Sequence, residues 1–218
     1  MEVQADKEAQ QQILQFMTTE HLTLQTARSA TIAEANGRCA LFMGSVSSAV
    51  VALAFIGQAS GLKEGFFLFG LALFPSLLFL GIFTFKRVLH TAVEDIIYAR
   101  GINRIRHYYI ELAPEVQRYF IQSIHDDTAG ALHGMGIIPT DSKWELFQTS
   151  AGMIAVIISM ISGVFVGLLS RFLFSLPIYT NFGLGIAFFV VSVFAQRHYI
   201  VKKFADLDIR LETLFPSE

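Results

Sequence analysis

The sequence predicts an all-α, polytopic membrane protein with four transmembrane helices, arranged as two hairpins that carry cytoplasmic helical extensions. Of its 218 residues, 53% are hydrophobic and only 16% are charged, whereas soluble domains carry about 25% charged residues. Four windows contain no Asp, Glu, Lys or Arg and reach the length of about 20 residues that a membrane-spanning helix needs. These windows do not alternate as the strands of an outer-membrane barrel do, so we expect helices.

The charge-free windows divide the chain into five parts. They cover residues 39–62, 65–85, 146–170 and 172–196. We therefore expect a cytoplasmic N-terminal helix continuing into the first span (1–38), a first transmembrane hairpin (39–85), a cytoplasmic helical segment (86–145), a second hairpin (146–196) and a cytoplasmic tail (197–218). Proline is typical of turns, so we expect Pro177 in the turn between the third and fourth spans and the fourth helix to begin near Ile178.

The basic residues predict the orientation. All of the 16 Lys and Arg except Lys63 and Arg171 lie on the side of the two termini. The positive-inside rule therefore predicts a multi-pass inner-membrane protein with both termini in the cytoplasm. The first 38 residues are rich in acids and have no apolar core, so we do not expect a signal peptide.

The polar segments predict further helices. Thr18 and Thr19 precede a stretch with few helix breakers, so we expect a helix from about Thr19 through the first span to Gly57. Residues 86–112 carry an apolar stripe of Val88, Val93, Ile96, Ile97, Ile102 and Ile105. We expect a second helix from Pro114 to near Ile124, a glycine-rich loop over 125–139, and a helix capped by Asp141 or Ser142 that carries Trp144 to the membrane surface.

The sequence lacks the residues on which several classes of membrane protein depend. No ionisable side chain lies deep within any span, which disfavours proton pumps, ion-coupled transporters and voltage sensors. No phosphate-binding loop, dinucleotide fingerprint or zinc motif occurs, and we expect no enzyme activity, no cofactor and no metal. Three groups of residues could have a chemical role or a purely structural one. Cys39 fits a nucleophile or a buried structural residue, and His90 with Glu94 and Asp95 fits a catalytic cluster or a solvent-exposed helix face. The third group fits either metal ligands or turn formers and comprises His125, Asp126, Asp127 and His133.

Two spans carry faces of small residues at helical spacing. The third has Ala151, Ala155, Ser159, Gly163 and Gly167, and the first has Ala40, Gly44, Ser48 and Ala52. Such faces let another helix approach closely, either within one bundle or between subunits. The first span also carries Ser45, Ser47, Ser48 and Gln58, which either satisfy local backbone groups or line a narrow pore.

The second span is rich in phenylalanine and contains Pro75 near its middle. A helix that is bulky and apolar on every side is typical of a lipid-facing position. Pro75 frees a backbone carbonyl and predicts either a gating hinge or a static kink.

A basic patch lies in the central segment. Arg100, Arg104, Arg106 and His107 fit a phosphate-bearing ligand, an anionic lipid head group or an acidic protein partner. The alternative is pairing with nearby acids such as Glu94, Asp95, Glu111 and Glu115. The formal net charge of -2 argues against nucleic acid as a partner.

Residues 18–28, 34–38 and 99–106 resemble a group of small four-span bacterial membrane proteins of uncharacterised function. The resemblance covers most of the chain and implies no activity, cofactor or site residue. From the residues we expect a homo-oligomeric protein, embedded in membrane lipid, that forms a pore or channel-like assembly gated by its cytoplasmic helices. The alternative is a non-conducting sensor, scaffold or defence effector that recruits a cytoplasmic partner through the basic patch.

Overall fold

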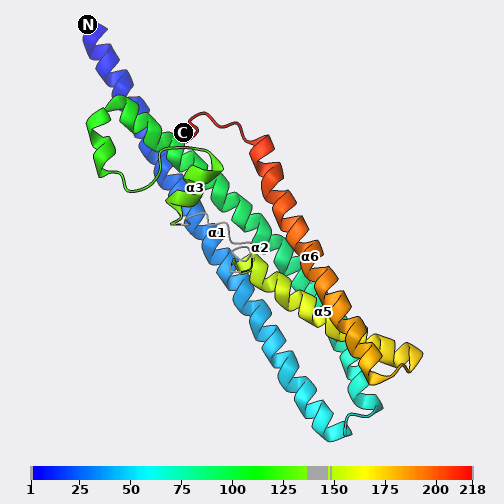
Figure 1. The fold of residues 1–218 in the computed structure, drawn as a ribbon. Coiled ribbons are helices and arrows are strands. Elements are labelled where there is room, and N and C mark those ends of the chain that lie inside the picture. Colours follow the sequence, from blue (N-terminus) through cyan, green and yellow to red (C-terminus); the bar gives the residue numbers. More distant parts are fainter. Residues whose placement is uncertain (1, 137–146, 148, 218) are drawn as a thin grey trace. The chain divides into compact units, whose positions relative to one another are not determined.

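The computed structural model describes residues 2–136, 147 and 149–217, and every regular element among them is helical. The elements are α1 (Glu2–Ser60), α2 (Glu64–Leu112), the 3-10 helix η1 (Pro114–Tyr119), α3 (Thr128–Gly134), α5 (Ser150–Phe174) and α6 (Ile178–Arg210) (Figure 1). In this part of the chain, four helices, α1, α2, α5 and α6, are long and apolar enough to cross a membrane. The all-helical prediction and the four long apolar helices are thereby confirmed.

The chain divides into two compact units, which we describe separately. The span unit comprises residues 34–90 and 142–203, and the tail unit comprises residues 1–33, 91–141 and 204–218. Each of α1, α2 and α6 contributes residues to both units.

Helix α1 begins at Glu2, so the predicted start near Thr19 is wrong. Residues 2–18 contain no Gly or Pro and are rich in strong helix formers such as Ala, Gln, Glu and Leu. The hydroxyls of Thr18 and Thr19 donate to the carbonyls of Leu14 and Gln15, each at 2.8 Å. These threonines therefore lie inside the helix and return their hydrogen bonds to the preceding turn instead of capping a new helix.

In the span unit, α1 and α2 lie against each other and are joined by the turn around Gly61 and Leu62. Both turn residues have a φ of 59°, a left-handed conformation that glycine adopts easily. Near the other end of this pair, Nε and Nη2 of Arg87 donate hydrogen bonds to the carboxylate of Glu34 at 2.8 and 2.7 Å. Hydrogen bonds from Arg87 and then Arg38 lower the pKa of Glu34 to about 2, which keeps this carboxylate ionised.

The second pair of long helices in the span unit is α5 and α6. Helix α5 begins at Ser150, later than the predicted span, because Thr149 caps it by accepting a hydrogen bond from the amide of Gly152 at 3.0 Å. Ser175 ends α5 with a φ of 50°, and α6 begins at Ile178 as predicted. The predicted cap at Asp141 or Ser142, and Trp144, lie outside the described residues.

The tail unit has a small apolar core. Val93, Ile96 and Ala99 of α2 pack with Ala131 of α3 and Leu207 of α6. Most of the predicted apolar stripe of α2 is buried, but Ile97 is 37% exposed and does not belong to this core.

Two further predictions in the tail unit are wrong. The helix that starts at Pro114 is a 3-10 turn that ends at Tyr119, and the region predicted as a loop contains α3. Asp127 caps α3, because its carboxylate accepts a hydrogen bond from the amide of Gly130 at 2.7 Å.

Candidate functional site

The small-residue face of α5 is occupied by α6 of the same chain. Ala151, Ala155 and Ser159 are buried. A Cβ atom built on Gly163 would lie 2.6 Å from the carbonyl oxygen of Gly185, so only glycine allows the two backbones to come this close. A Cβ on Gly167 would lie 3.2 Å from the carbonyl oxygen of Asn181. This face therefore serves packing between two helices within one chain.

Buried polar groups on α5 and α6 are partnered across the same contact. The hydroxyl of Ser159 donates to that of Ser192 at 3.0 Å, and the amide nitrogen of Gln196 donates to Ser159 at 2.9 Å. Toward the α5–α6 turn, Ser170 donates to the side-chain oxygen of Asn181 at 2.8 Å. Such groups would be costly in lipid without partners, and the chain provides partners for these hydroxyls and for the Gln196 nitrogen. Among the described residues, the side-chain oxygen of Gln196 is buried without a hydrogen-bond partner.

The small-residue face of α1 is open. We call Gly37, Ala40, Gly44 and Ser48 the open α1 face, because all four are exposed. A Cβ atom on Gly37 or Gly44 would have none of the described residues within 4 Å. Phe42, only 1% exposed, lies about 200° around the helix from Gly44, so the open face points away from the buried side of α1. Ala52, the last residue of the predicted set, is half-buried.

Outward faces of the neighbouring helices have a different composition. On α2 the exposed side chains include Phe79 and Phe83, and on α6 they include Val191 and Phe194. Bulky apolar side chains of this kind are typical of a lipid-facing surface, while small ones are typical of helix–helix contacts in membranes. The open α1 face therefore has the composition of a contact surface without having a partner in the described chain.

The polar residues of the first span and Pro75 of the second lie on or within single helices. Ser45 donates to the carbonyl of Leu41 at 2.9 Å, which satisfies it within the helix. Ser47, Ser48 and Gln58 are exposed on α1. Pro75 lies inside α2, which continues as a helix on both sides of it.

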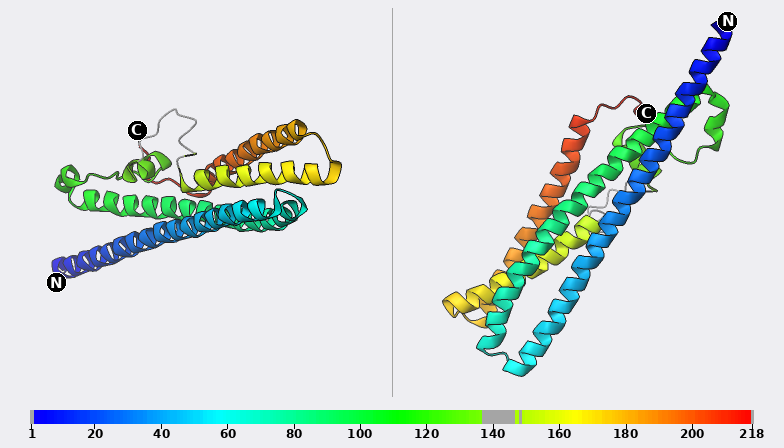
Figure 2. Two further views of the ribbon diagram at one scale, coloured as in Figure 1. Left: turned by 90° about the horizontal axis from the view of Figure 1, so that it is seen from below. Right: turned by 180° about the vertical axis from the view of Figure 1, so that it is seen from behind.

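The basic patch of the tail unit is engaged by the chain's own C-terminal segment (residues 211–217). Arg100 is 2% exposed, and its Nη2 donates to the carbonyl of Leu211 at 3.2 Å and to the hydroxyl of Thr213 at 2.8 Å. Arg104 pairs with Asp126 at 2.5 Å and also donates to the carbonyl of Glu212. Figures 1 and 2 show the chain end lying beside α2 and α3.

The rest of the patch is also in contact with neighbouring groups. Arg106 donates to Asn103 at 2.9 Å and to Gln122. The ring of His107 stacks on Phe215 with 3.7 Å between the ring centroids. His107 also lies 3.7 Å from Glu111, one of the acids that the sequence offered as a partner.

Asp126 binds the C-terminal segment, a role that differs from the metal ligand or turn former that the sequence suggests for it. Its side chain is 0% exposed and accepts hydrogen bonds from the amides of Leu214 and Phe215 as well as from Arg104. The amide of Asp126 in turn donates to the carbonyl of Phe215 at 3.1 Å. Burial by itself raises the pKa of this carboxyl, but the bonds from Phe215, Leu214 and Arg104 together hold that pKa below its ordinary value.

The metal interpretation of residues 125–133 finds no support in the described residues. They contain no group of three His, Cys, Asp or Glu placed to hold a metal ion. Asp126 binds the C-terminal segment, and Asp127 caps α3 and accepts a hydrogen bond from the amide of Ser217 at 2.9 Å. Cys39 is a free, buried cysteine at the start of the first span.

No protein-family model, curated protein or solved structure matches this chain. The resemblance to small four-span bacterial proteins therefore stays a prediction, and the function must be argued from the geometry.

Proposed function

We propose that this protein is a homo-oligomeric inner-membrane protein whose subunits associate around Gly37, Ala40 and Gly44 of the open α1 face. Ser48, at the end of that contact, faces the pathway of a channel-like assembly. The observation that carries the proposal is the open space around Gly37 and Gly44, on a helix that is long and apolar enough to span the membrane. In lipid, helices associate mainly through close packing and hydrogen bonding, since lipid tails are as apolar as the side chains. A small-residue face gives a second copy of α1 the closest approach.

A pathway along α1 would have a polar part and an apolar part. Ser47 and Ser48 are exposed beside Gly44, whereas Val51 and Phe55 continue the same side of the helix with large exposed side chains. In an assembly around α1, the serines would line the wider part and Phe55 would form an apolar constriction, which can gate by dewetting. The α5 face has no place in this lining because α6 covers it.

Conductance with cysteine accessibility tests the proposal. In a Cys39→Ala background, Ser48→Cys is reconstituted in planar bilayers and treated with a positively charged thiol reagent. We expect channel openings that the reagent reduces, because a bulky cation would be attached inside the pathway. Phe83→Cys, on the bulky outer side of α2, is the matched control and should leave the current unchanged. An oligomer that never conducts, or a block only at residue 83, would contradict the channel.

The second candidate is a non-conducting membrane-anchored sensor or scaffold. It is favoured by the contact between the C-terminal segment and Arg100 and Arg104, because an acidic partner could compete for these arginines. Asp126→Asn weakens the hold on the segment and should increase capture of such a partner by the full-length protein. Unchanged capture, together with conductance of the wild type, would count against this candidate.

A further inference from the structure

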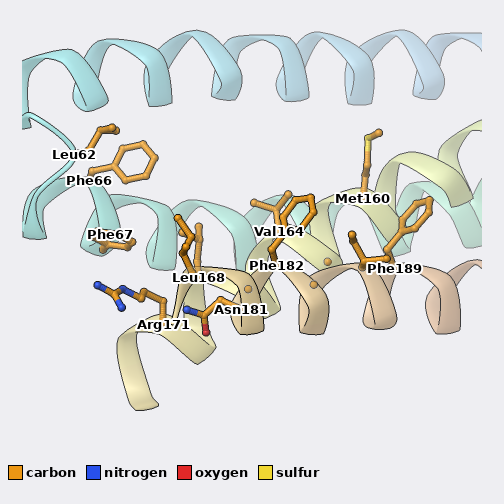
Figure 3. A pocket seen from close by; sticks show the side chains of 15 residues that line it. Leu62, Phe66, Phe67, Met160, Val164, Leu168, Arg171, Asn181, Phe182 and Phe189 are labelled. Atoms are coloured by element: carbon orange, nitrogen blue, oxygen red, sulfur yellow. The ribbon is translucent and has the colours of Figure 1, made fainter. Parts of the chain in front are cut away.

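The span unit contains a large apolar cavity between the start of α2, α5 and α6. Its volume is about 980 Å³, within the range of roughly 300–1,000 Å³ typical of ligand pockets. The walls are formed by phenylalanine and aliphatic side chains, including Phe67, Val164 and Phe182 (Figure 3). Water is a poor occupant for such a cavity, because the apolar walls offer it few hydrogen-bond partners.

One end of the cavity is polar. Arg171 and Asn181 lie together there, while Met160 and Phe189 lie at the opposite end (Figure 3). The Arg171 guanidinium donates to the carbonyl of Leu176 at 2.8 Å. Among the described residues, no carboxylate lies within ion-pair distance of it, and the cavity lining contains no acid. The positive charge at the mouth is therefore not neutralised by the described chain.

The cavity is about as deep as one leaflet of a bilayer. From Met160 to Arg171 the lining follows α5 for a rise of about 16 Å. The hydrocarbon core of a bilayer is about 30 Å thick, so one leaflet contributes about 15 Å. A chain that enters beside Arg171 and ends near Met160 would thus have the length of an acyl chain in its leaflet.

We propose that this cavity binds an acyl chain of an anionic phospholipid, whose phosphate pairs with Arg171. The guanidinium suits a phosphate because it donates two parallel hydrogen bonds. The occupant follows from the cation at the mouth, the apolar walls and the depth together. The expected orientation of the chain puts this site in the outer leaflet. The inference rests on membrane insertion of the span unit and requires neither oligomerisation nor conductance.

Lipid retention by the purified full-length protein tests the site. Native mass spectrometry compares phosphatidylglycerol with phosphatidylcholine of the same acyl chains. We expect wild type to prefer phosphatidylglycerol, and Arg171→Gln to lower its affinity by about five- to tenfold, to the level of phosphatidylcholine. Arg171→Lys should retain most of the preference. Arg197→Gln is the matched control for general surface charge and should behave as wild type.

Variants that fill the cavity distinguish binding of the acyl chain from binding of the head group alone. Val164→Trp should weaken both lipids, since both acyl chains need the same space. Met160→Trp, at the far end, serves the same purpose if the first variant does not fold, as judged by its helical circular dichroism. Equal affinity of the wild type for both lipids would overturn the proposal. So would an Arg197→Gln effect as large as that of Arg171→Gln, or retention unchanged by both tryptophans.

Discussion

The small-residue faces of α5 and α1 have similar sequences but different surroundings. On α5, a Cβ atom at Gly163 would lie 2.6 Å from the backbone of α6, whereas on α1 a Cβ atom at Gly44 would have no atom of the described chain within 4 Å. The first face is closed by the chain itself and the second is open. The pattern therefore predicts that a helix can be approached closely, but not whether the approaching helix comes from the same chain.

The arginines of the two units show the same contrast. Arg100 and Arg104 in the tail unit bind the C-terminal segment and nearby acids, while Arg171 in the span unit has only a backbone carbonyl as its described partner. Closed sites should contribute to the stability of the single chain. Open sites should contribute to association or ligand binding and leave that stability nearly unchanged.

The largest expected effect is on the closed face. Gly163→Leu places a side chain where the α6 backbone lies, and overpacking of this severity should lower the free energy of unfolding by about 3 kcal/mol or more. The measurement is unfolding in mixed detergent micelles, followed by circular dichroism. Gly183→Leu, on the exposed side of α6 with nothing within 4 Å, is the matched control. Equal stability of the two variants would show that the α5–α6 contact is looser than described.

A smaller effect is expected from releasing the C-terminal segment. Asp126→Asn removes the charge that receives Arg104 and the two amides, and should cost about 1–3 kcal/mol of local stability. Limited proteolysis should then cut the C-terminal segment faster than in wild type. Glu115→Gln, an exposed acid of η1, is the control. Unchanged cleavage would mean that Asp126 does not hold this segment.

Acid should release the same segment. Because the folded state lowers the pKa of Asp126, this carboxylate stabilises the tail unit above its unfolded value of about 3.9. That contribution is lost as the pH falls from about 3.9 through the lower folded value. Cleavage by pepsin, which works in acid, should rise over this interval in wild type but change less in Asp126→Asn. A rise of the same size in both would assign the transition to other groups.

A modest effect is expected at the polar cluster of the closed face. Ser192→Ala removes one partner of Ser159 and Gln196, and hydrogen bonds between membrane helices contribute about 0.6 kcal/mol on average. The same micelle unfolding measurement should show a loss of this order. Ser76→Ala is a suitable control, because its hydroxyl bonds only to the preceding turn of α2. A loss above about 2 kcal/mol would indicate a more cooperative network.

Much of the fold could be predicted because it depends on local properties. Charge-free windows predict the four long helices, and Pro177 predicts the start of α6. The beginning of α1 could not be predicted from Thr18 and Thr19, because their hydroxyls bond within the helix rather than marking its start. Helix α3 could not be predicted from its composition, because Gly130 and Gly134 are poor helix formers and the cap at Asp127 is visible only in the structure.

The candidate sites depend on contacts between residues that are distant in the sequence. The binding of Leu214 and Phe215 to Asp126 joins positions about 90 apart, and no local pattern encodes it. The same holds for the closure of the α5 face by Gly185 of α6, because the sequence shows small-residue faces on the first and third spans but not the helix that covers either of them. Sequence reasoning could therefore identify the basic patch and both small-residue faces, but not which of them the chain satisfies internally.

The mass of the protein particle in lipid nanodiscs tests the central contrast most directly. We predict that wild type and Gly183→Leu are oligomers of the 24.3 kDa chain. Gly44→Leu should be a monomer with a stability within about 0.5 kcal/mol of wild type, since Gly44 is exposed and a Cβ atom built there lies within 4 Å of no described residue. A monomeric wild type, or a Gly44→Leu variant that remains fully oligomeric, would contradict association through the open α1 face.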